Sequence, residues 1–394
     1  MLLVSPRVHR IVISKVESKW QYEMTFESQH LATSSYIYSN QLSIFSMKTL
    51  FSIFSSVLFF SSLAIQCSIQ DEENDVFLPL PATSKGLAIG PEGYAVESFG
   101  GGVYMVTDGS YQCLFVASTK GVILVDLPPT IGKNIFFAIG NITDKPITHF
   151  VYSHSHADHV GTASLVAKSG VEVIAHEETT ELLRTYADPS RPVPTKSFEH
   201  DYVVKLGNQT VHLSYKGENH CRGNIFIYAP SAHVLMLVDV VFPGWAPFSL
   251  LAVSSNIPGW IDAHDQILND YPKMNHYIGG HLGRSGNRQD VLIQREYMHD
   301  LRTACTAAIE LTATEDPILG AMHIQDTVLT GNPGNYWAVF KVYLGLVAER
   351  CANVTNEKWL GKLGAVDVFA FEDAYAMVEH LRLDYNVLGP FRNV

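Results

Sequence analysis

The residues best suited to chemistry form one short run, Ser153-His154-Ser155-His156-Ala157-Asp158-His159-Val160-Gly161. Its three imidazoles and one carboxylate are ligand types that suit zinc and neighbouring transition metals. His154 and His156 stand two positions apart, so an extended backbone would point both side chains the same way. Asp158 is expected to cap a helix over residues 162–168, which would direct the end of the run toward a second ion. A histidine-rich surface turn without a metal is the alternative, and the spacing of the run disfavours it.

Length and composition indicate a sizeable folded core. The chain has 394 residues, of which 47% are hydrophobic and 17% charged. Wholesale disorder is therefore excluded. The formal net charge is −12 and no run of basic residues occurs. This balance disfavours nucleic acid or an anionic membrane surface as a partner.

The N-terminal region has the layout of a targeting segment. Residues 1–46 show no sustained period, and the chain then restarts at Met47 with one lysine, an apolar run over 50–65 and a short polar tail at Cys67. We interpret 47–67 as a secretory signal peptide and 1–46 as a non-native or dispensable extension. The protein is then expected to be secreted, without stable membrane association. The alternative is an uncleaved signal anchor, although the run is marginal for the about 20 residues that span a bilayer.

Two further features fit an extracellular protein. Sequons for N-glycosylation, which predict a glycoprotein, occur at Asn141, Asn208 and Asn353. The four cysteines after Cys67 allow three pairings. Cys305 and Cys351 both fall in expected helices and form the preferred bridge, whereas Cys221 is expected to be free.

The apolar pattern predicts two groups of strands with helices between and after them. Strands are expected over 103–107, 112–117, 122–126, 148–153, 171–176, 201–206, 210–215, 225–229 and 233–239. Helices are expected over 128–139, 177–186, 289–314, 336–353 and 365–384. This order favours an α/β fold in which two sheets pack face to face with helices outside. Residues 285–394 are then a helical extension packed on that domain.

The histidine run resembles the signature of the metallo-β-lactamase superfamily, and three later motifs follow in that family's order. His220 lies in Lys216-Gly217-Glu218-Asn219-His220-Cys221-Arg222-Gly223-Asn224, Asp239 closes an apolar strand, and His281 follows a glycine pair. The resemblance covers residues 98–284. It implies a four-layer αβ/βα sandwich of the metallo-β-lactamase type with a C-terminal helical cap.

The resemblance also implies a ligand set. One Zn²⁺ would be held by His154, His156 and His220, and a second by Asp158, His159 and His281. Asp239 would bridge the two ions, and Asp126, at the end of an early strand, would orient a ligand imidazole. The implied reaction is hydrolysis of an ester, lactone, thioester or amide of a small molecule by zinc-activated hydroxide, with Asp158 as the catalytic group that holds or moves the proton.

Departures from relatives narrow these expectations. An acid at Asp239 resembles the glyoxalase II, lactonase and esterase branches, but Phe242 stands where lactonases of acyl-homoserine lactones usually carry tyrosine. Phe242, Trp245 and Trp260 are candidate substrate-pocket residues. One alternative is a mononuclear enzyme with one Fe²⁺, of the persulfide dioxygenase type. Another is a secreted, non-catalytic binding protein that keeps the metal for stability.

Overall fold

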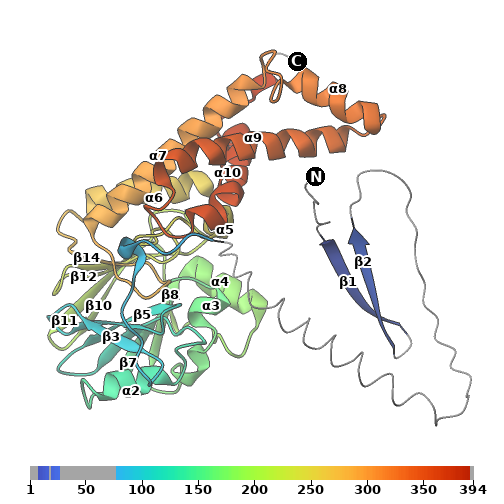
Figure 1. Cartoon of the computed structure of the whole chain (residues 1–394). Coiled ribbons are helices and arrows are strands. Elements are labelled where there is room, and N and C mark those ends of the chain that lie inside the picture. The colour runs from blue at the N-terminus through green and yellow to red at the C-terminus, as the bar shows by residue number, and fades with distance from the viewer. Residues whose placement is uncertain (1–7, 17–18, 27–76, 391–394) are drawn as a thin grey trace, which may run out of the picture. The chain divides into compact units, whose positions relative to one another are not determined.

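The computed structural model describes residues 8–16, 19–26 and 77–390 (Figure 1). The predicted signal peptide over 47–67 lies outside these residues. The chain divides into two compact units, Met1–Asn74 and Asp75–Val394. In the first unit, β1 (Val8–Val16) and β2 (Lys19–Phe26) pair as antiparallel strands.

The second unit contains a seven-stranded sheet whose strands follow chain order. Its strands are β3 (Ala95–Ser98), β4 (Val103–Thr107), β5 (Gln112–Ala117), β6 (Val122–Val125), β7 (Ile147–Val151), β8 (Glu172–His176) and β9 (Lys196–Phe198). Pairing is antiparallel up to β6 and parallel from β6 to β9. Parallel neighbours require crossover connections, and these contain α2 (Asn134–Gly140) and α4 (Glu177–Tyr186).

A five-stranded sheet faces the first. Its strands are β10 (Asp201–Leu206), β11 (Gln209–Ser214), β12 (Phe226–Ala229), β13 (Val234–Met236) and β14 (His276–Ile278). Pairing is antiparallel except between β13 and β14, which run parallel. The crossover between these two contains α5 (Ser249–Val253) and α6 (Ile257–Asp270).

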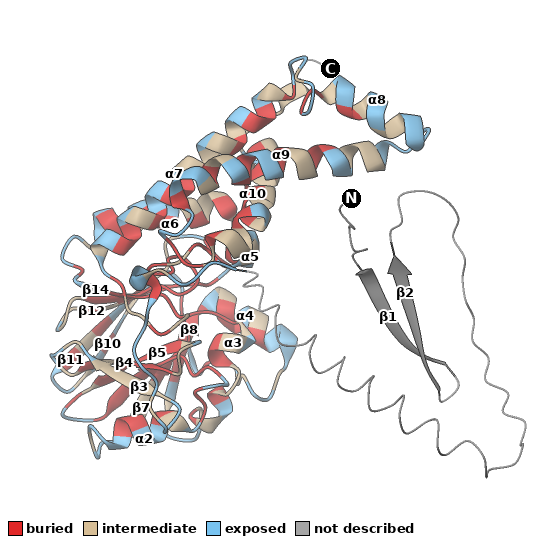
Figure 2. Ribbon diagram, in the orientation of Figure 1, coloured by how far each residue is buried: buried red, intermediate tan, exposed pale blue. Residues whose placement is uncertain are grey.

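Three apolar clusters show that the unit has four layers. One cluster fills the space between the sheets, where Val116 and Ile174 of the first sheet meet Leu213 and Ile227 of the second. A second cluster joins the outer face of the seven-stranded sheet to α2 and α4. The third joins the outer face of the five-stranded sheet to the C-terminal helices. The buried residues in Figure 2 accordingly line both sheets and the inner faces of the helices. The expected four-layer sandwich is confirmed.

The C-terminal region is helical, as expected. It comprises α7 (Arg288–Leu311), α8 (Ala321–Gly331), α9 (Tyr336–Trp359) and α10 (Val366–Leu383). A capping box between Asn287 and Asp290 begins α7. The preferred disulfide is present and links Cys305 of α7 to Cys351 of α9. Among the described residues, no helix is long and apolar enough to cross a bilayer.

Several predicted boundaries were wrong, for local reasons. The helix expected from residue 128 begins only at Asn134, because the preceding proline pair and Gly132, with φ +45°, form a turn. The strand expected over 233–239 is limited to Val234–Met236. Asp158 caps no helix after residue 162. It lies inside the short α3 (Ala157–Val160), whose N-cap residue is His156, and a 3₁₀ turn (Ala163–Leu165) follows.

Candidate metal centre

The seven predicted ligands converge from separate loops at one edge of the sandwich. His154 and His156 follow β7, and Asp158 and His159 lie in α3. His220 precedes β12, Asp239 follows β13, and His281 follows β14. The structure therefore brings together every residue that the sequence assigned to the two metal positions.

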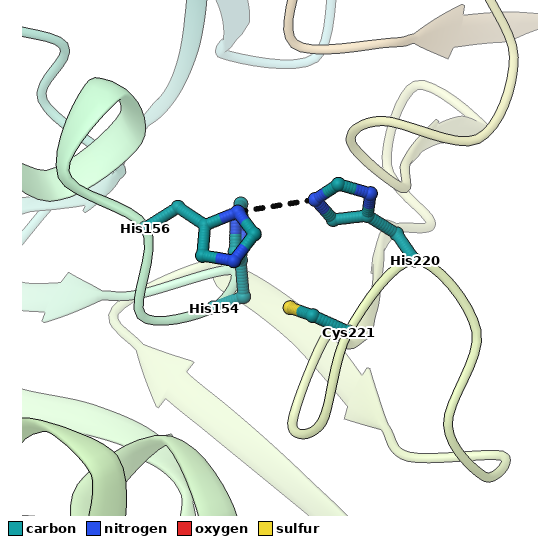
Figure 3. A group of neighbouring side chains, drawn as sticks. All are labelled: His154, His156, His220 and Cys221. Carbon is teal, nitrogen blue, oxygen red and sulfur yellow. Dashed lines mark hydrogen bonds between the residues drawn. The ribbon is translucent and has the colours of Figure 1, made fainter. Parts of the chain in front are cut away.

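The first group consists of His154, His156 and His220, with Cys221 beside them (Figure 3). One potential ligand atom from each residue lies within 4.8 Å of those of the others. His220 Nε2 lies 3.1 Å from His156 Nδ1. Two nitrogens bound tetrahedrally to one zinc ion, each at about 2.0–2.1 Å, lie about 3.3 Å apart. The imidazole spacing therefore suits a shared ion.

The second group consists of Asp158, His159 and His281. Their atoms meet at the Asp158 carboxylate, whose Oδ2 is 3.6 Å from His159 Nε2 and 3.7 Å from His281 Nε2. The two imidazole nitrogens are themselves 3.1 Å apart. This group has the same compact spacing as the first, so it also suits an ion.

Asp239 lies between the two groups. Its Oδ2 is 3.6 Å from His154 Nε2, 3.1 Å from His159 Nε2 and 3.3 Å from His220 Nε2. Its Oδ1 is 2.8 Å from His281 Nε2. The carboxylate thus faces imidazoles of both groups, which is the position that a bridging ligand requires.

An unsatisfied polar atom inside the cluster indicates that a cation fits there. His154 Nε2 is buried, lies 3.6 Å from Asp239 Oδ2 and has no hydrogen-bond partner among the described residues. Leaving such atoms unpaired costs about 1–3 kcal/mol each. A divalent ion would satisfy His154 Nε2, and donors of imidazole and carboxylate type suit zinc and iron alike.

Neighbouring groups orient the ligands. His154 Nδ1 is 2.9 Å from Ser153 Oγ, and His220 Nδ1 is 3.3 Å from Ser254 Oγ. Asp126 is fully buried and accepts a hydrogen bond from Ser153 N at 2.8 Å. Its other oxygen lies 3.9 Å from His159 Nδ1, where the sequence expected an orienting acid.

Backbone geometry aims the carboxylates and brings the loops close together. Asp126, directly after β6, and Asp239, three residues after β13, have left-handed conformations with φ of 60° and 62°. Gly280 has φ +89°, and a Cβ there would come within 2.9 Å of His159 Cε1. Glycine is therefore required next to His281, because a side chain would strike a ligand.

The buried ionisable groups of the centre shift one another's pKa values. Burial opposes charge on His159, but Asp239, Asp126 and Asp158 outweigh it and raise the His159 pKa to about 9. Burial lowers the pKa of His220 to about 4, despite the opposing charge of Asp239. Burial would raise the pKa of Asp239, yet the facing histidines hold it well below its usual value. Asp239 is therefore ionised and ready to bind a cation.

The second group is the more open one. The side chains of Asp158 and His281 are 41% and 25% exposed, whereas that of His154 is wholly buried. A substrate therefore has access from the side of Asp158 and His281.

Tyr111 was missed by the sequence analysis. Its ring centroid lies 4.7 Å from that of His281, and the nearby Asp158 charge, after burial, raises its pKa. Gln112 N donates to Gly280 O at 2.8 Å, so the turn carrying Tyr111 is fixed to the loop of His281. No local motif marks this tyrosine, because its place depends on a contact between distant loops.

The three predicted pocket residues lie in different surroundings. The Phe242 ring is 6.0 Å from that of His281. Trp245 donates to Ser84 O at 3.0 Å and belongs to a contact with the C-terminal segment at Gly364. Trp260 is fully buried in α6 and donates to Asp239 O at 2.7 Å. Trp260 therefore supports the Asp239 backbone and has no exposed surface for a substrate, because residues 257–260 begin a helix rather than a loop.

The four-layer sandwich and the His/Asp cluster at its edge define an α/β protein with a candidate binuclear metal site. Comparison with known families agrees, since residues 106–271 match the family model described as the metallo-beta-lactamase superfamily. Residues 106–271 are therefore similar to the metallo-beta-lactamase superfamily.

Similar proteins fall in the same superfamily or are related enzymes. The 2,4-dinitroanisole O-demethylase subunit alpha of Nocardioides sp. (strain JS1661) is 27% identical over 198 residues, which are 49% of this chain and 59% of that protein. The metallo-beta-lactamase type 2 of Bacillus sp. (strain 170) is 24% identical over 44% of this chain and 67% of that protein. A solved metallo-beta-lactamase from Pontibacter korlensis aligns with a TM-score of 0.45 and 22% identity, covering 52% of this chain and 97% of that chain.

Proposed function

We propose that this protein is a metal-dependent hydrolase that binds two Zn²⁺ ions and cleaves an ester, lactone, thioester or amide bond of a small molecule. The observation that carries the proposal is the position of Asp239, whose two carboxylate oxygens face imidazoles of both ligand groups. A structural metal site would need neither a bridging acid nor a second, solvent-accessible group.

The residues of the centre would have different roles in metal binding and proton transfer. His154, His156 and His220 would hold one ion, Asp158, His159 and His281 the other, and Asp239 would contact both. Bound divalent cations supply Lewis-acid polarisation and a water of lowered pKa. Asp158 is the most exposed acid of the cluster and would hold or pass a proton at its carboxylate.

The surroundings favour a small, partly apolar substrate. Tyr111 and Phe242 lie beside His281, which is on the open side of the centre. The net charge of −12 gives no support to a polyanionic partner. The Nocardioides relative is a 2,4-dinitroanisole O-demethylase subunit, so an aryl methyl ether belongs in the substrate screen.

We also propose that the protein is secreted and glycosylated. Support comes from the Cys305–Cys351 disulfide, which persists in oxidising compartments. The sequon asparagines Asn141, Asn208 and Asn353 are all exposed on the surface, as glycosylation requires.

The deciding experiment combines elemental analysis with a chromogenic screen of esters, lactones, thioesters, cephalosporins and 2,4-dinitroanisole. About two zinc ions per chain and turnover of one bond class are expected. Asp239→Asn should lose an ion and reduce kcat by at least about 100-fold, because it removes the shared charge. Asp326→Asn, at an exposed position of α8, is the matched control. One iron per chain would favour the persulfide dioxygenase alternative, and bound metal without any turnover would favour a binding protein.

A further inference from the structure

Cys221 lies against the first ligand group although no metal role was expected for it. Its Sγ is within 4.8 Å of potential ligand atoms of His154, His156 and His220. Figure 3 shows its side chain on the same side of the loop as the three imidazoles. The residue is 7% exposed and forms no disulfide.

The surroundings distinguish Cys221 from an ordinary core cysteine. Cys113, the other free cysteine of the described residues, packs in an apolar cluster with α2 and α4. Cys221 is in none of the three apolar clusters of the described residues. Its neighbour His154 is fully buried, and His154 Nε2 has no hydrogen-bond partner in the described part of the chain. The Cys221 sulfur therefore lies within 4.8 Å of a ligand nitrogen of a histidine that is fully buried and has one unsatisfied nitrogen.

We propose that Cys221 Sγ is a fifth protein ligand at the first metal position, beside His154, His156, His220 and the bridging Asp239. The inference rests on the proposed metal-dependent function and adds a sulfur donor to it. On binding, the S–H bond of Cys221 breaks, the proton passes to solvent, and the sulfur electron pair forms the bond to the cation. No electrons are exchanged.

A sulfur ligand would change which metal ions the first position prefers. Thiolate is a soft ligand, so the first position would prefer zinc or cobalt over magnesium, calcium or manganese. Zinc sites sometimes expand from four to five ligands, so three imidazoles, the Asp239 carboxylate and the Cys221 sulfur would together fill this position. The second group, with a carboxylate in place of sulfur, would be the harder of the two positions.

Cobalt substitution tests the proposal without any substrate. Metal-free full-length protein is titrated with Co²⁺ while absorption is recorded. Visible bands report bound Co²⁺, and a near-ultraviolet charge-transfer band reports a cobalt–sulfur bond. Wild type should show both, Cys221→Ala should lose the near-ultraviolet band and bind Co²⁺ about tenfold more weakly, and Cys113→Ala should keep both.

The outcomes separate this inference from the proposed function. Visible bands without a sulfur band in wild type would overturn the ligand role of Cys221 and leave the metal site intact. Failure of wild type to bind Co²⁺ would overturn both. X-ray absorption of the zinc-loaded wild type needs no variant, and a shell at about 2.3 Å, the zinc–sulfur distance, is expected. Only nitrogen and oxygen neighbours would contradict the proposal.

Discussion

Three of the imidazoles at this centre, those of His154, His159 and His220, have a neighbouring side chain beside the ring nitrogen that faces away from the other ligands. Asp126 is the buried example, since one of its oxygens accepts the Ser153 N–H and the other faces His159 Nδ1. Burial raises the pKa of Asp126 to about 6, although His159 opposes that rise. The neighbouring His159 therefore favours the ionised form of Asp126, and Asp126 in turn orients His159.

Asp126→Asn tests this support. Asparagine tolerates the left-handed backbone at this position and keeps an oxygen for Ser153 N, but it lacks the negative charge. We expect zinc affinity to fall about 10- to 100-fold, as for other groups that orient metal ligands. Competition with a chelator measures the change, and Asp144→Asn, on an exposed loop, should leave the affinity unaltered. Equal affinities for both variants would exclude an orienting role.

At the scale of elements, α6 and α7 support the loop that begins at Asp239. Gln294 of α7 accepts the Phe242 N–H at 2.7 Å and donates to Val240 O at 2.5 Å. Its side-chain nitrogen also lies 3.0 Å from Nε2 of His264 in α6. The helical extension therefore contacts the backbone next to a predicted metal ligand.

Gln294→Ala should weaken both the fold and the metal site. Removing its side chain leaves buried backbone groups unpaired, so we expect the free energy of unfolding to fall by about 2–3 kcal/mol. Metal affinity should fall with it, because the Asp239 loop loses its anchor. Gln289→Ala, exposed in the first turn of the same helix, is the matched control. An unchanged unfolding midpoint in denaturant would refute this role.

His264 predicts a pH dependence of stability. Burial lowers its pKa to about 4 from an ordinary value of 6.5. Below pH 6.5 the unfolded chain therefore binds a proton that the folded chain does not bind. This contribution, about 3 kcal/mol from the shift, is complete above pH 6.5 and is lost as the pH falls toward 4. Denaturant unfolding at several pH values should show a shallower acid slope for His264→Gln than for wild type.

The sequence predicted the metal ligands better than the residues that pack around them. The metal ligands lie in short motifs next to strands, so the residue types and their spacing were enough to identify them. The apolar pattern of those strands also predicted the two groups of strands. Tyr111, Gln294 and His264 reach the centre through contacts between distant segments, and no local pattern marks such contacts. The strand expected over 233–239 was also too long, because left-handed His233 precedes it and the regular pairing stops at Met236 although the apolar run continues.

At the scale of the whole molecule, one covalent link joins the C-terminal helices. The Cys305–Cys351 disulfide closes a sequence separation of 46 residues between α7 and α9. A loop of that size implies a stabilisation of about 4 kcal/mol from chain entropy. Replacing both cysteines by alanine should lower the unfolding free energy by about 2–4 kcal/mol. Reductant should destabilise wild type but leave the double variant unaffected, and equal sensitivity of both would contradict this assignment.

The apolar interface between the five-stranded sheet and the C-terminal helices has a consequence for protein engineering. Leu235 and Tyr277 lie under those helices in one continuous apolar cluster. Truncation of the chain after His281, the last predicted ligand, would expose this apolar surface. It would also remove the hydrogen bonds from Gln294 to the backbone of Val240 and Phe242. The truncated protein should therefore aggregate on expression. A transfer of the metal centre to another protein would have to include the C-terminal helices.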